Sequence, residues 1–401
     1  MAANTPDVDN PAALFTQDNW RADNLGEPCI GAFEYHFFTD ARIIGTAETG
    51  FGPYQFFNTV GKRHRPGFIQ PAIVMRMLVH FSEPFRFDQD PLKMDNTRYH
   101  GGFRQDELGA LVSLCLGRRI KAGGETRWFK SGGDPVGQPV DWGKRQSPVL
   151  MLDDDYLVLP DVAGRNAEAG QYFMAGANMD DLHPIKSVPY ITSGQYITLI
   201  RAARYYQDAL WIAESEPNLA WLMIVSALES AAGEYSSTLG TPEEILRESR
   251  TDLVKLLQEA GGDELVRKVA LLMEPELRAT RKFINFVLDF LPTPPPRRPS
   301  HLYNQVDWSK AEQRKLLNKI YQYRSNALHG GIPFPYPMNQ PPPRVWEDDP
   351  APPEIPEGLG TTALGGTWAR ADTPITLNTF HYIARGALLK WWSSLSEPSV
   401  S

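Results

Sequence analysis

The residues best suited to chemistry in this 401-residue chain stand in one short segment, YRSNALHGG, at residues 323–331. Arg324 carries a planar, permanently charged guanidinium that can donate two hydrogen bonds to one phosphate. Four residues separate it from His329, whose imidazole titrates near pH 6.5 and becomes easier to protonate at a helix C-terminus. Cleavage of RNA by its own 2′-hydroxyl needs an acid, a base and positive charge at the phosphate. This pair is suited to that chemistry, which would leave DNA intact.

The helical geometry of the segment raises a question about how the two side chains meet. Five residues at about 100° each place Arg324 and His329 about 140° apart around a straight helix. Either the arginine side chain bends back, or the last turn loosens before Gly330, or the pair forms across the two-fold axis of a dimer. We favour the dimer, because isologous contacts are the commonest kind in homo-oligomers. Asn326 lies on the far side from Arg324 and is expected to meet the partner or the phosphate, whereas Ser325 shares a face with His329.

The helix that carries the segment is strongly basic. Residues 308–329 contain five basic residues and one acidic residue, a net charge of 5 − 1 = +4 in a chain of net charge −8. A solvated face is the simpler interpretation, and RNA binding is the functional one, for the side chains Lys310, Arg314, Lys315 and Lys319. Glu229 stands on an apolar helix, where an unpaired carboxylate would be costly, so we expect it to pair with a basic residue of this helix and to orient Arg324 or His329. Tyr321 and Tyr323 could stack on bases, but at their helical spacing packing is the favoured role.

Three segments of the second half resemble the HEPN superfamily, and in particular its Apea-like members from bacterial abortive-infection systems. They are WLMIVSALESAAGE with Ala227, Leu228 and Glu229; YRSNALHGG, which matches the family's R-x4-H motif; and FHYIARGALLKWWSSL. The resemblance covers roughly residues 190 to 396. It implies a helical bundle that dimerises with two R-x4-H segments facing each other, and in many members a metal-independent ribonuclease. Other members keep the fold without catalysis.

Helical patterns follow one another from about Tyr190, with clear start and stop signals. Thr241 with Glu244 and Ser309 with Glu312 both fit a capping box, Pro217 suits a first helical turn, and Gly261–Gly262 and Gly330 are expected stops. The predicted helices span residues 191–214, 217–234, 241–259, 263–273, 275–291, 309–330 and 373–395. Residues 332–356 contain ten prolines and predict an extended surface segment of polyproline character.

The first half mixes short β-like runs with turns, and one helix is predicted near residues 105–116. Strands are expected within residues 68–81, 149–152 and 156–159. The fold class is therefore predicted as α+β, with a mixed or mostly β domain at 1–185 and a HEPN-like bundle at 186–401. Asp153, Asp154 and Asp155 are expected to form a simple turn rather than a cation site, residues 61–65 (GKRHR) a basic loop, and Trp391 and Trp392 to pack in the core.

Composition excludes several classes of protein. An apolar fraction of 42% with 22% charged residues indicates a folded chain, and net charge −8 argues against coating nucleic acid by bulk electrostatics. The longest apolar run, residues 219–228, is half of what a bilayer span needs. P-loop, HExxH, paired CxxC and GxGxxG motifs are absent, so no metal or cofactor is expected. Two cysteines, Cys29 and Cys115, and a start without a secretory signal indicate a cytoplasmic protein.

These observations predict a metal-independent endoribonuclease, a hydrolase-class nuclease acting in phage defence or toxin-like growth arrest. RNA is the expected substrate, a second copy of the chain the expected partner, and the N-terminal domain a sensor for a regulatory ligand or phage component. Two alternatives stay open. One is a non-catalytic HEPN module that binds RNA, a nucleotide or a protein partner, and the other is an enzyme in the first half that the bundle dimerises.

Overall fold

The computed structural model describes residues 15–59, 69–80, 104–130, 134–140, 176–235, 240–342, 349–356, 360–363 and 366–395. The chain forms two compact units, residues 1–211 with 392–401 and residues 212–391. The boundary between the units lies after Trp211, beyond the boundary predicted at residue 185. The reason is that helix α5 (Ser193–Ile212) is hydrogen-bonded to the first unit. Its Gln207 donates to the Ile120 carbonyl at 2.6 Å, and its Tyr196 donates to Glu107 at 2.7 Å. A sheet in one unit and helices in the other confirm the α+β class.

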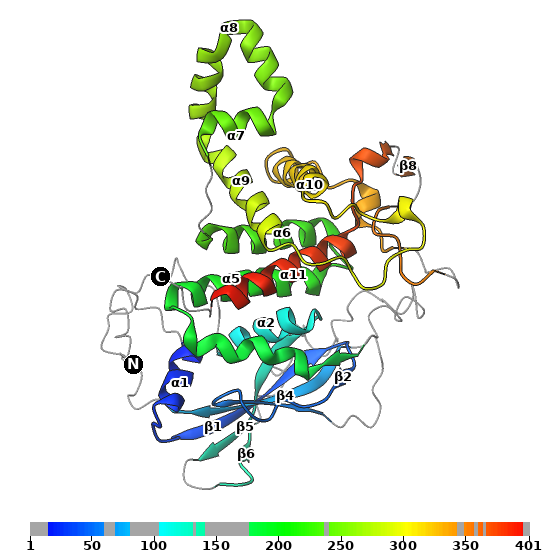
Figure 1. The fold of residues 1–401 in the computed structure, drawn as a ribbon. Helices are drawn as coiled ribbons and strands as arrows, with labels where there is room; N and C mark the ends of the chain where they lie inside the picture. Colours follow the sequence, from blue (N-terminus) through cyan, green and yellow to red (C-terminus); the bar gives the residue numbers. More distant parts are fainter. Residues whose placement is uncertain are drawn as a thin grey trace. The chain divides into compact units, whose positions relative to one another are not determined.

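The first unit is built on an antiparallel sheet of strand order β3-β4-β1-β5-β6 (Figure 1). Its helices α1 and α2 come from amphipathic or apolar runs, and α2 packs against β5. On β1 the residues Tyr35, Phe37 and Thr39 are buried, whereas Glu34 faces the other side and pairs with Arg76 of β4 at 2.6 Å. The alternation is the period-two pattern of a sheet with one covered face. The bounds are α1 Phe15–Asn24, β1 Gly31–Thr39, β3 Tyr54–Asn58, β4 Gln70–Val79, α2 Arg104–Leu116, β5 Lys121–Lys130 and β6 Gln138–Pro139.

A short strand pair and a 3-10 segment also belong to the first unit. Strands β2 (Ile43–Ile44) and β7 (Ala177–Asn178) form a short parallel pair. The 3-10 segment η3 (Met179–Tyr190) follows, and Asn178 caps its start. Gln17 of α1 donates to the carbonyls of Val188 and Ile191 at 3.0 and 2.8 Å, which fixes η3 beside α1.

The second unit is a helical assembly with an aromatic core. Trp221 of α6 (Pro217–Glu234) is fully buried between Phe334 and Phe380, with ring centroids 5.0 and 4.9 Å away. Helix α6 packs on α9 (Glu274–Asp289) and α10 (Lys310–Gly330), and α11 (Leu377–Leu395) supplies Phe380. Trp391 and Trp392 are 1% and 0% exposed, which confirms their packing role.

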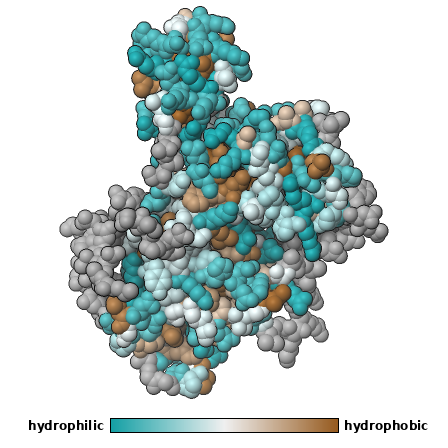
Figure 2. Space-filling model, in the orientation of Figure 1, coloured by the Kyte–Doolittle hydropathy of each residue, from teal (hydrophilic) through white to brown (hydrophobic). Residues whose placement is uncertain are grey.

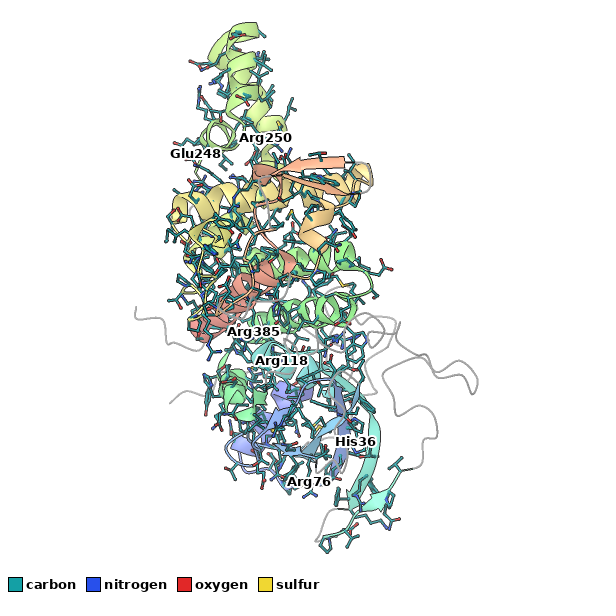
Figure 3. All side chains as sticks on the ribbon, turned by 90° about the vertical axis from the view of Figure 1, so that its right-hand side faces the viewer. His36, Arg76, Arg118, Glu248, Arg250 and Arg385 are labelled. Carbon is teal, nitrogen blue, oxygen red and sulfur yellow. The ribbon has the colours of Figure 1, made fainter. Side chains whose placement is uncertain are left out.

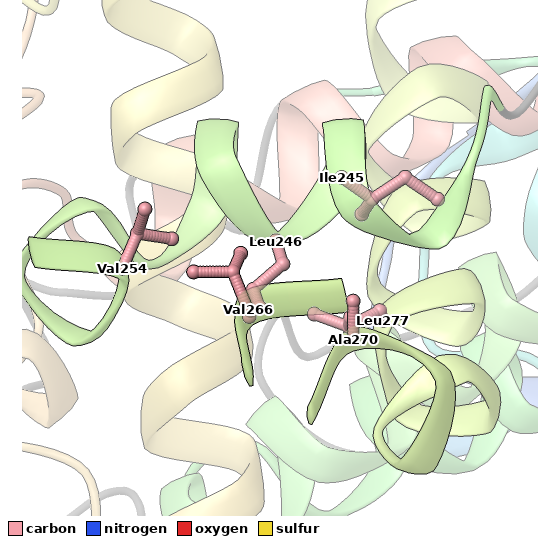
Figure 4. Close-up of a cluster of buried hydrophobic side chains, with 6 residues drawn as sticks. All are labelled: Ile245, Leu246, Val254, Val266, Ala270 and Leu277. Atoms are coloured by element: carbon pink, nitrogen blue, oxygen red, sulfur yellow. The ribbon is translucent and has the colours of Figure 1, made fainter. Parts of the chain in front are cut away.

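A second, smaller core holds together helices α7 (Pro242–Ser249), α8 (Thr251–Leu272) and the start of α9 (Figure 4). It consists of the buried side chains Ile245, Leu246, Val254, Val266, Ala270 and Leu277, and we call these three helical stretches the arm. The face of the arm that Figure 2 shows is largely hydrophilic, with isolated hydrophobic residues. The arm is therefore held by its own apolar cluster.

Several helix signals are where the sequence predicted them. The capping box of Thr241 and Glu244 is complete, and Pro217 stands in the first turn of α6. Helices α5, α6, α2 and strand β4 match their predicted ranges within a few residues. The backbone leaves helical geometry at Gly261 and Gly262, so the expected stop is a kink within α8.

Other boundaries differ from prediction. The helix expected over 241–259 is broken at Arg250, which allows both Leu246 and Val254 to face the arm core. The expected box at Ser309 is only half formed, because Asp307 accepts the Ser309 N–H at 2.8 Å and Glu312 pairs instead with Lys315. Helix α10 ends at Gly330 as predicted, but its left-handed cap residue is the following Gly331 (φ 63°). Helix α11 starts at Leu377, because the Thr376 hydroxyl accepts from the Thr379 N–H.

The prediction that the proline-rich segment, residues 332–356, lies on the surface is wrong for much of its described part. That part is buried rather than extended along the surface. Phe334 stacks on Trp221, and Pro337 and Met338 are buried in the 3-10 turn η5 (Tyr336–Asn339). Glu354 is 4% exposed and forms a two-point ion pair with Arg298. The segment is thus partly an element of the core. Short elements complete the unit: η4 Leu302–Asn304, the hairpin β8 Gly360–Ala363 with β9 Gly366–Ala369, and η6 Arg370–Asp372.

Four predictions fall on residues outside the described ranges: the strands at 149–152 and 156–159, the turn at Asp153–Asp155, and the basic loop at 61–65. Among the described helices, none has the length and hydropathy needed to cross a bilayer.

Candidate functional site

Arg324 is held by a carboxylate and a tyrosine from two packed helices. Its Nη2 donates to Glu229 Oε2 on α6 at 2.8 Å, and the Tyr321 hydroxyl donates to Glu229 Oε1, also at 2.8 Å. The guanidinium carbon lies 5.4 Å from the centroid of the Tyr321 ring. The Arg324 and Glu229 side chains are 21% and 23% exposed. Glu229 therefore has the partner on the basic helix that its apolar surroundings require, and this partner is Arg324.

The hydroxyl of Tyr321 stays protonated in this arrangement. Burial raises its pKa well above the ordinary value, and the charge of Glu229 raises the pKa further. The ring is 7% exposed and packs against Phe283 at 5.2 Å between centroids. Tyr321 is therefore a permanent donor to Glu229 and a packing residue, as its helical spacing favoured.

His329 is exposed in the last turn of α10. The helix continues unbroken past it to Gly330, and the chain turns at Gly331, whose cap places the Ile332 N–H on the Asn326 carbonyl at 3.2 Å. The last turn is thus not loosened before Gly330. Since the Arg324 side chain is directed to Glu229, it does not bend back toward His329 either. The two side chains lie on different faces of α10, about 140° apart.

The remaining predicted residues have distinct surroundings. Ser325 is half-buried on the face of α10 that also carries His329, and Asn326 is half-buried with its carbonyl in the C-cap. Among the four basic residues, Lys310 is exposed and Arg314 is half-buried. Lys315 pairs with Glu312 at 2.6 Å, and Lys319 pairs with Asp372 at 3.1 Å.

Lys319 and Tyr323 both form hydrogen bonds to Asp372 of η6. The Tyr323 hydroxyl donates to the Asp372 carbonyl at 2.7 Å, and the Lys319 ammonium lies 5.4 Å from the Tyr323 ring centroid. Burial by itself would lower the pKa of Lys319, but the interactions with Asp372 and Tyr323 together outweigh it, and the pKa is raised. Lys319 is thus a fixed cation, and Tyr323 is anchored to η6 by its hydroxyl.

A pocket of about 300 Å³ adjoins this helix, and sequence reasoning did not find it. We call it the α9–α10 pocket, because α9 and α10 supply most of its wall and the α7–α8 junction supplies the rest. Its lining residues are Arg250, Leu277, Thr280, Lys315, Asn318, Lys319, Tyr321, Gln322 and Ser325. Arg250 lies at the α7–α8 junction (Figure 3). The spacing of Asn318, Gln322, Ser325 and His329 was the available signal, because steps of four, three and four residues follow one helix face.

Comparison of the chain with protein-family models, with curated proteins and with solved structures finds no match. Within the described ranges, no three His, Cys, Asp or Glu side chains come together as a metal-ion site.

Proposed function

We propose that this protein is a metal-independent endoribonuclease of the HEPN type, with Arg324 and His329 as its catalytic residues. The observation that carries the proposal is the pairing of Arg324 with Glu229 and Tyr321, on the same helix whose last turn exposes His329. A guanidinium fixed through one nitrogen keeps its other N–H groups for a ligand. Its Nε is buried without a hydrogen-bond partner among the described residues, so a phosphate would meet the Nη groups.

The proposed reaction is attack of the RNA 2′-oxygen on the adjacent phosphorus. As that bond forms, the bond from phosphorus to the 5′-oxygen breaks, one base removes the 2′ proton, and one acid protonates the leaving 5′-oxygen. His329 can do either proton transfer, and Arg324 neutralises the charge that develops on the phosphorane oxygens. The products are a 2′,3′-cyclic phosphate and a 5′-hydroxyl.

A homodimer supplies the geometry that one chain lacks. With Arg324 and His329 on different faces of one helix, a two-fold axis beside α10 would bring both residues of each chain to one cleft. Leu328 and Ile332 flank His329 and are 51% and 59% exposed, so a second copy would bury apolar surface at this position. In this arrangement Glu229 is a positioning residue for Arg324, and Lys310, Arg314, Lys315 and Lys319 attract the strand.

The biological setting and the first unit belong to the same proposal. By resemblance to Apea-like proteins, the nuclease acts in the cytoplasm in phage defence or toxin-like growth arrest. The first unit is then the sensor that responds to a regulatory ligand or phage component.

The test is cleavage of a mixed RNA pool by the full chain, beside Arg324→Ala and His329→Ala. We expect each variant to lose at least about 100-fold in rate, the usual contribution of one acid–base or charge-stabilising group. Matched controls are His183→Ala and Arg267→Ala, which alter exposed side chains outside α9 and α10. If both site variants cleave as fast as the parent while folded, the site assignment is wrong. Specific binding of RNA without cleavage by the parent would favour the non-catalytic module instead.

A further inference from the structure

Three cationic residues from two sides line the α9–α10 pocket. Arg250 comes from the α7–α8 junction, and Lys315 and Lys319 come from α10. No carboxylate is among the described residues that line it; Glu312 and Asp372, which pair with the two lysines, lie outside the lining. A concave surface with several cations and no lining anion favours a ligand that carries negative charge.

The rest of the wall is suited to a nucleoside. Asn318 and Gln322 present amides, each of which can donate and accept, as recognition of a base edge requires. Leu277 and Tyr321 also line the pocket, but they are only 3% and 7% exposed, so they offer a base or sugar a small apolar patch. A volume of about 300 Å³ is at the lower end of the range for small-ligand pockets.

Arg250 is held in place by the backbone on both sides. Its N–H donates to the Leu246 carbonyl at 2.9 Å, and its carbonyl accepts from the Val254 N–H at 3.0 Å. Leu246, Val254 and Leu277 are members of the arm core (Figure 4), and Leu277 also lines the pocket, so the core and the pocket wall share this residue. The backbone that carries this exposed cation is thus part of a packed structure.

The pocket lies on the His329 face of α10. Asn318, Gln322, Ser325 and His329 follow one another along this face, and Ser325 at the edge of the pocket is one helical turn, about 6 Å of rise, from His329. A ligand in the pocket would therefore extend along the helix toward the exposed imidazole.

We propose that the α9–α10 pocket binds a nucleoside phosphate, with its phosphate on Arg250 and Lys315 and its base against Asn318 and Gln322. The ligand can be one unit of an RNA strand, in which case this subsite deepens the function proposed above and rests on it, or a free nucleotide. Both sources share the same chemistry, and direct binding measurements distinguish them.

The experiment uses the full chain carrying His329→Ala, in EDTA, so that binding is measured without cleavage. The probes are the nucleoside 5′-monophosphates of A, C, G and U, titrated calorimetrically, and a short fluorescent single-stranded RNA, followed by anisotropy. We expect Lys315→Gln and Gln322→Glu each to raise the Kd of the bound monophosphate at least tenfold. Lys315→Gln should also reduce the salt dependence of RNA binding by about 0.7 in slope. Both positions are exposed, so the variants should stay folded.

The matched control is Lys255→Gln. Lys255 and Lys315 are 71% and 73% exposed, and each pairs with an acidic residue three positions earlier, but only Lys315 lines the pocket. Loss of monophosphate and RNA affinity together assigns the pocket to the strand, whereas loss of monophosphate affinity alone assigns it to a free nucleotide. Absence of saturable monophosphate binding, or equal affinity in the pocket variants and the control, would overturn the proposal. Neither result depends on whether the parent cleaves RNA.

Discussion

Arg324 differs from an ordinary surface arginine in having its orientation set by a second residue. Glu229 accepts from Arg324 through one oxygen and from Tyr321 through the other, so the carboxylate itself is held in one orientation. A partly buried ion pair of this kind costs desolvation, and its satisfied hydrogen bonds offset that cost. The arrangement gives Arg324 a fixed position and removes flexibility, which suits a group that must meet a phosphate in one geometry.

The first unit contains a buried acid that predicts a pH dependence of stability. Glu107 of α2 is fully buried and accepts from Tyr196 at 2.7 Å, and burial raises its pKa to about 7. The folded state therefore keeps the proton between pH 4.5 and about 7, where the unfolded chain has lost it. In that window the folded state binds more protons, so the free energy of unfolding falls as pH rises.

Glu107→Gln should remove this dependence, because an amide fills the same space and does not titrate. Relative to the variant, the parent should lose about 3 kcal/mol of unfolding free energy between pH 4.5 and pH 8, measured by urea denaturation. Glu264→Gln, at a side chain 67% exposed, is the matched control and should show almost no such change. A difference between parent and Glu107→Gln that is the same at both pH values would show that Glu107 is not held protonated.

At the scale of elements, α10 depends on the turn that ends it. Gly331 has φ 63° and open space where a Cβ would stand, with no atom within 4 Å, whereas Gly330 is helical and its Cβ would make only ordinary contact with Ile332 at 3.6 Å. The backbone conformation at Gly331 therefore requires glycine, whereas Gly330 can be replaced by alanine. The position of His329 at the end of the helix depends on the first of them.

Gly331→Ala should destabilise the second unit by about 1 kcal/mol, because an L-residue with a side chain rarely adopts this φ. Gly330→Ala should be neutral or stabilising by up to about 1 kcal/mol, since alanine is the better helix former. Thermal or urea unfolding of both variants beside the parent measures the difference. Equal effects of the two substitutions would contradict the placement of the C-cap at Gly331.

Sequence reasoning succeeds here where structure is local. The Thr241 capping box, Pro217 and the Gly261–Gly262 kink could be predicted because each depends on residues within one turn. The break at Arg250 could not, because it serves packing between Leu246 and Val254 in a core that only the folded arm creates. The burial of Phe334 escaped prediction for the same reason, since proline content indicates an extended backbone but not what the segment packs against.

The candidate site, too, could be predicted only in part. The pairing of Glu229 with α10 followed from the cost of an unpaired carboxylate on an apolar helix, and the structure identifies Arg324 as the partner. The α9–α10 pocket needs α9, α10 and the α7–α8 junction together, so no single stretch of sequence encodes it. The sequence alone could indicate only that Asn318, Gln322 and Ser325 lie on one face of the helix.

At the scale of the whole molecule, the proposed function requires two chains. A mixture of Arg324→Ala and His329→Ala subunits should cleave RNA faster than either variant alone, because only the heterodimer contains an intact Arg324 and an intact His329 at the two-fold axis. Coexpression with different tags and tandem purification isolates this species. If each active site lay within one chain, the heterodimer would be as inactive as the two homodimers, and the dimeric arrangement would be wrong.

The most direct measurement is incubation of the purified full chain with a mixed RNA pool in EDTA, beside His329→Ala, with the ends of the fragments analysed. We expect cleavage by the parent that survives chelation, leaves 2′,3′-cyclic phosphate ends and is lost in the variant, while single-stranded DNA stays intact. Cleavage that persists in His329→Ala, or fragments with 3′-hydroxyl ends, would contradict the proposed function.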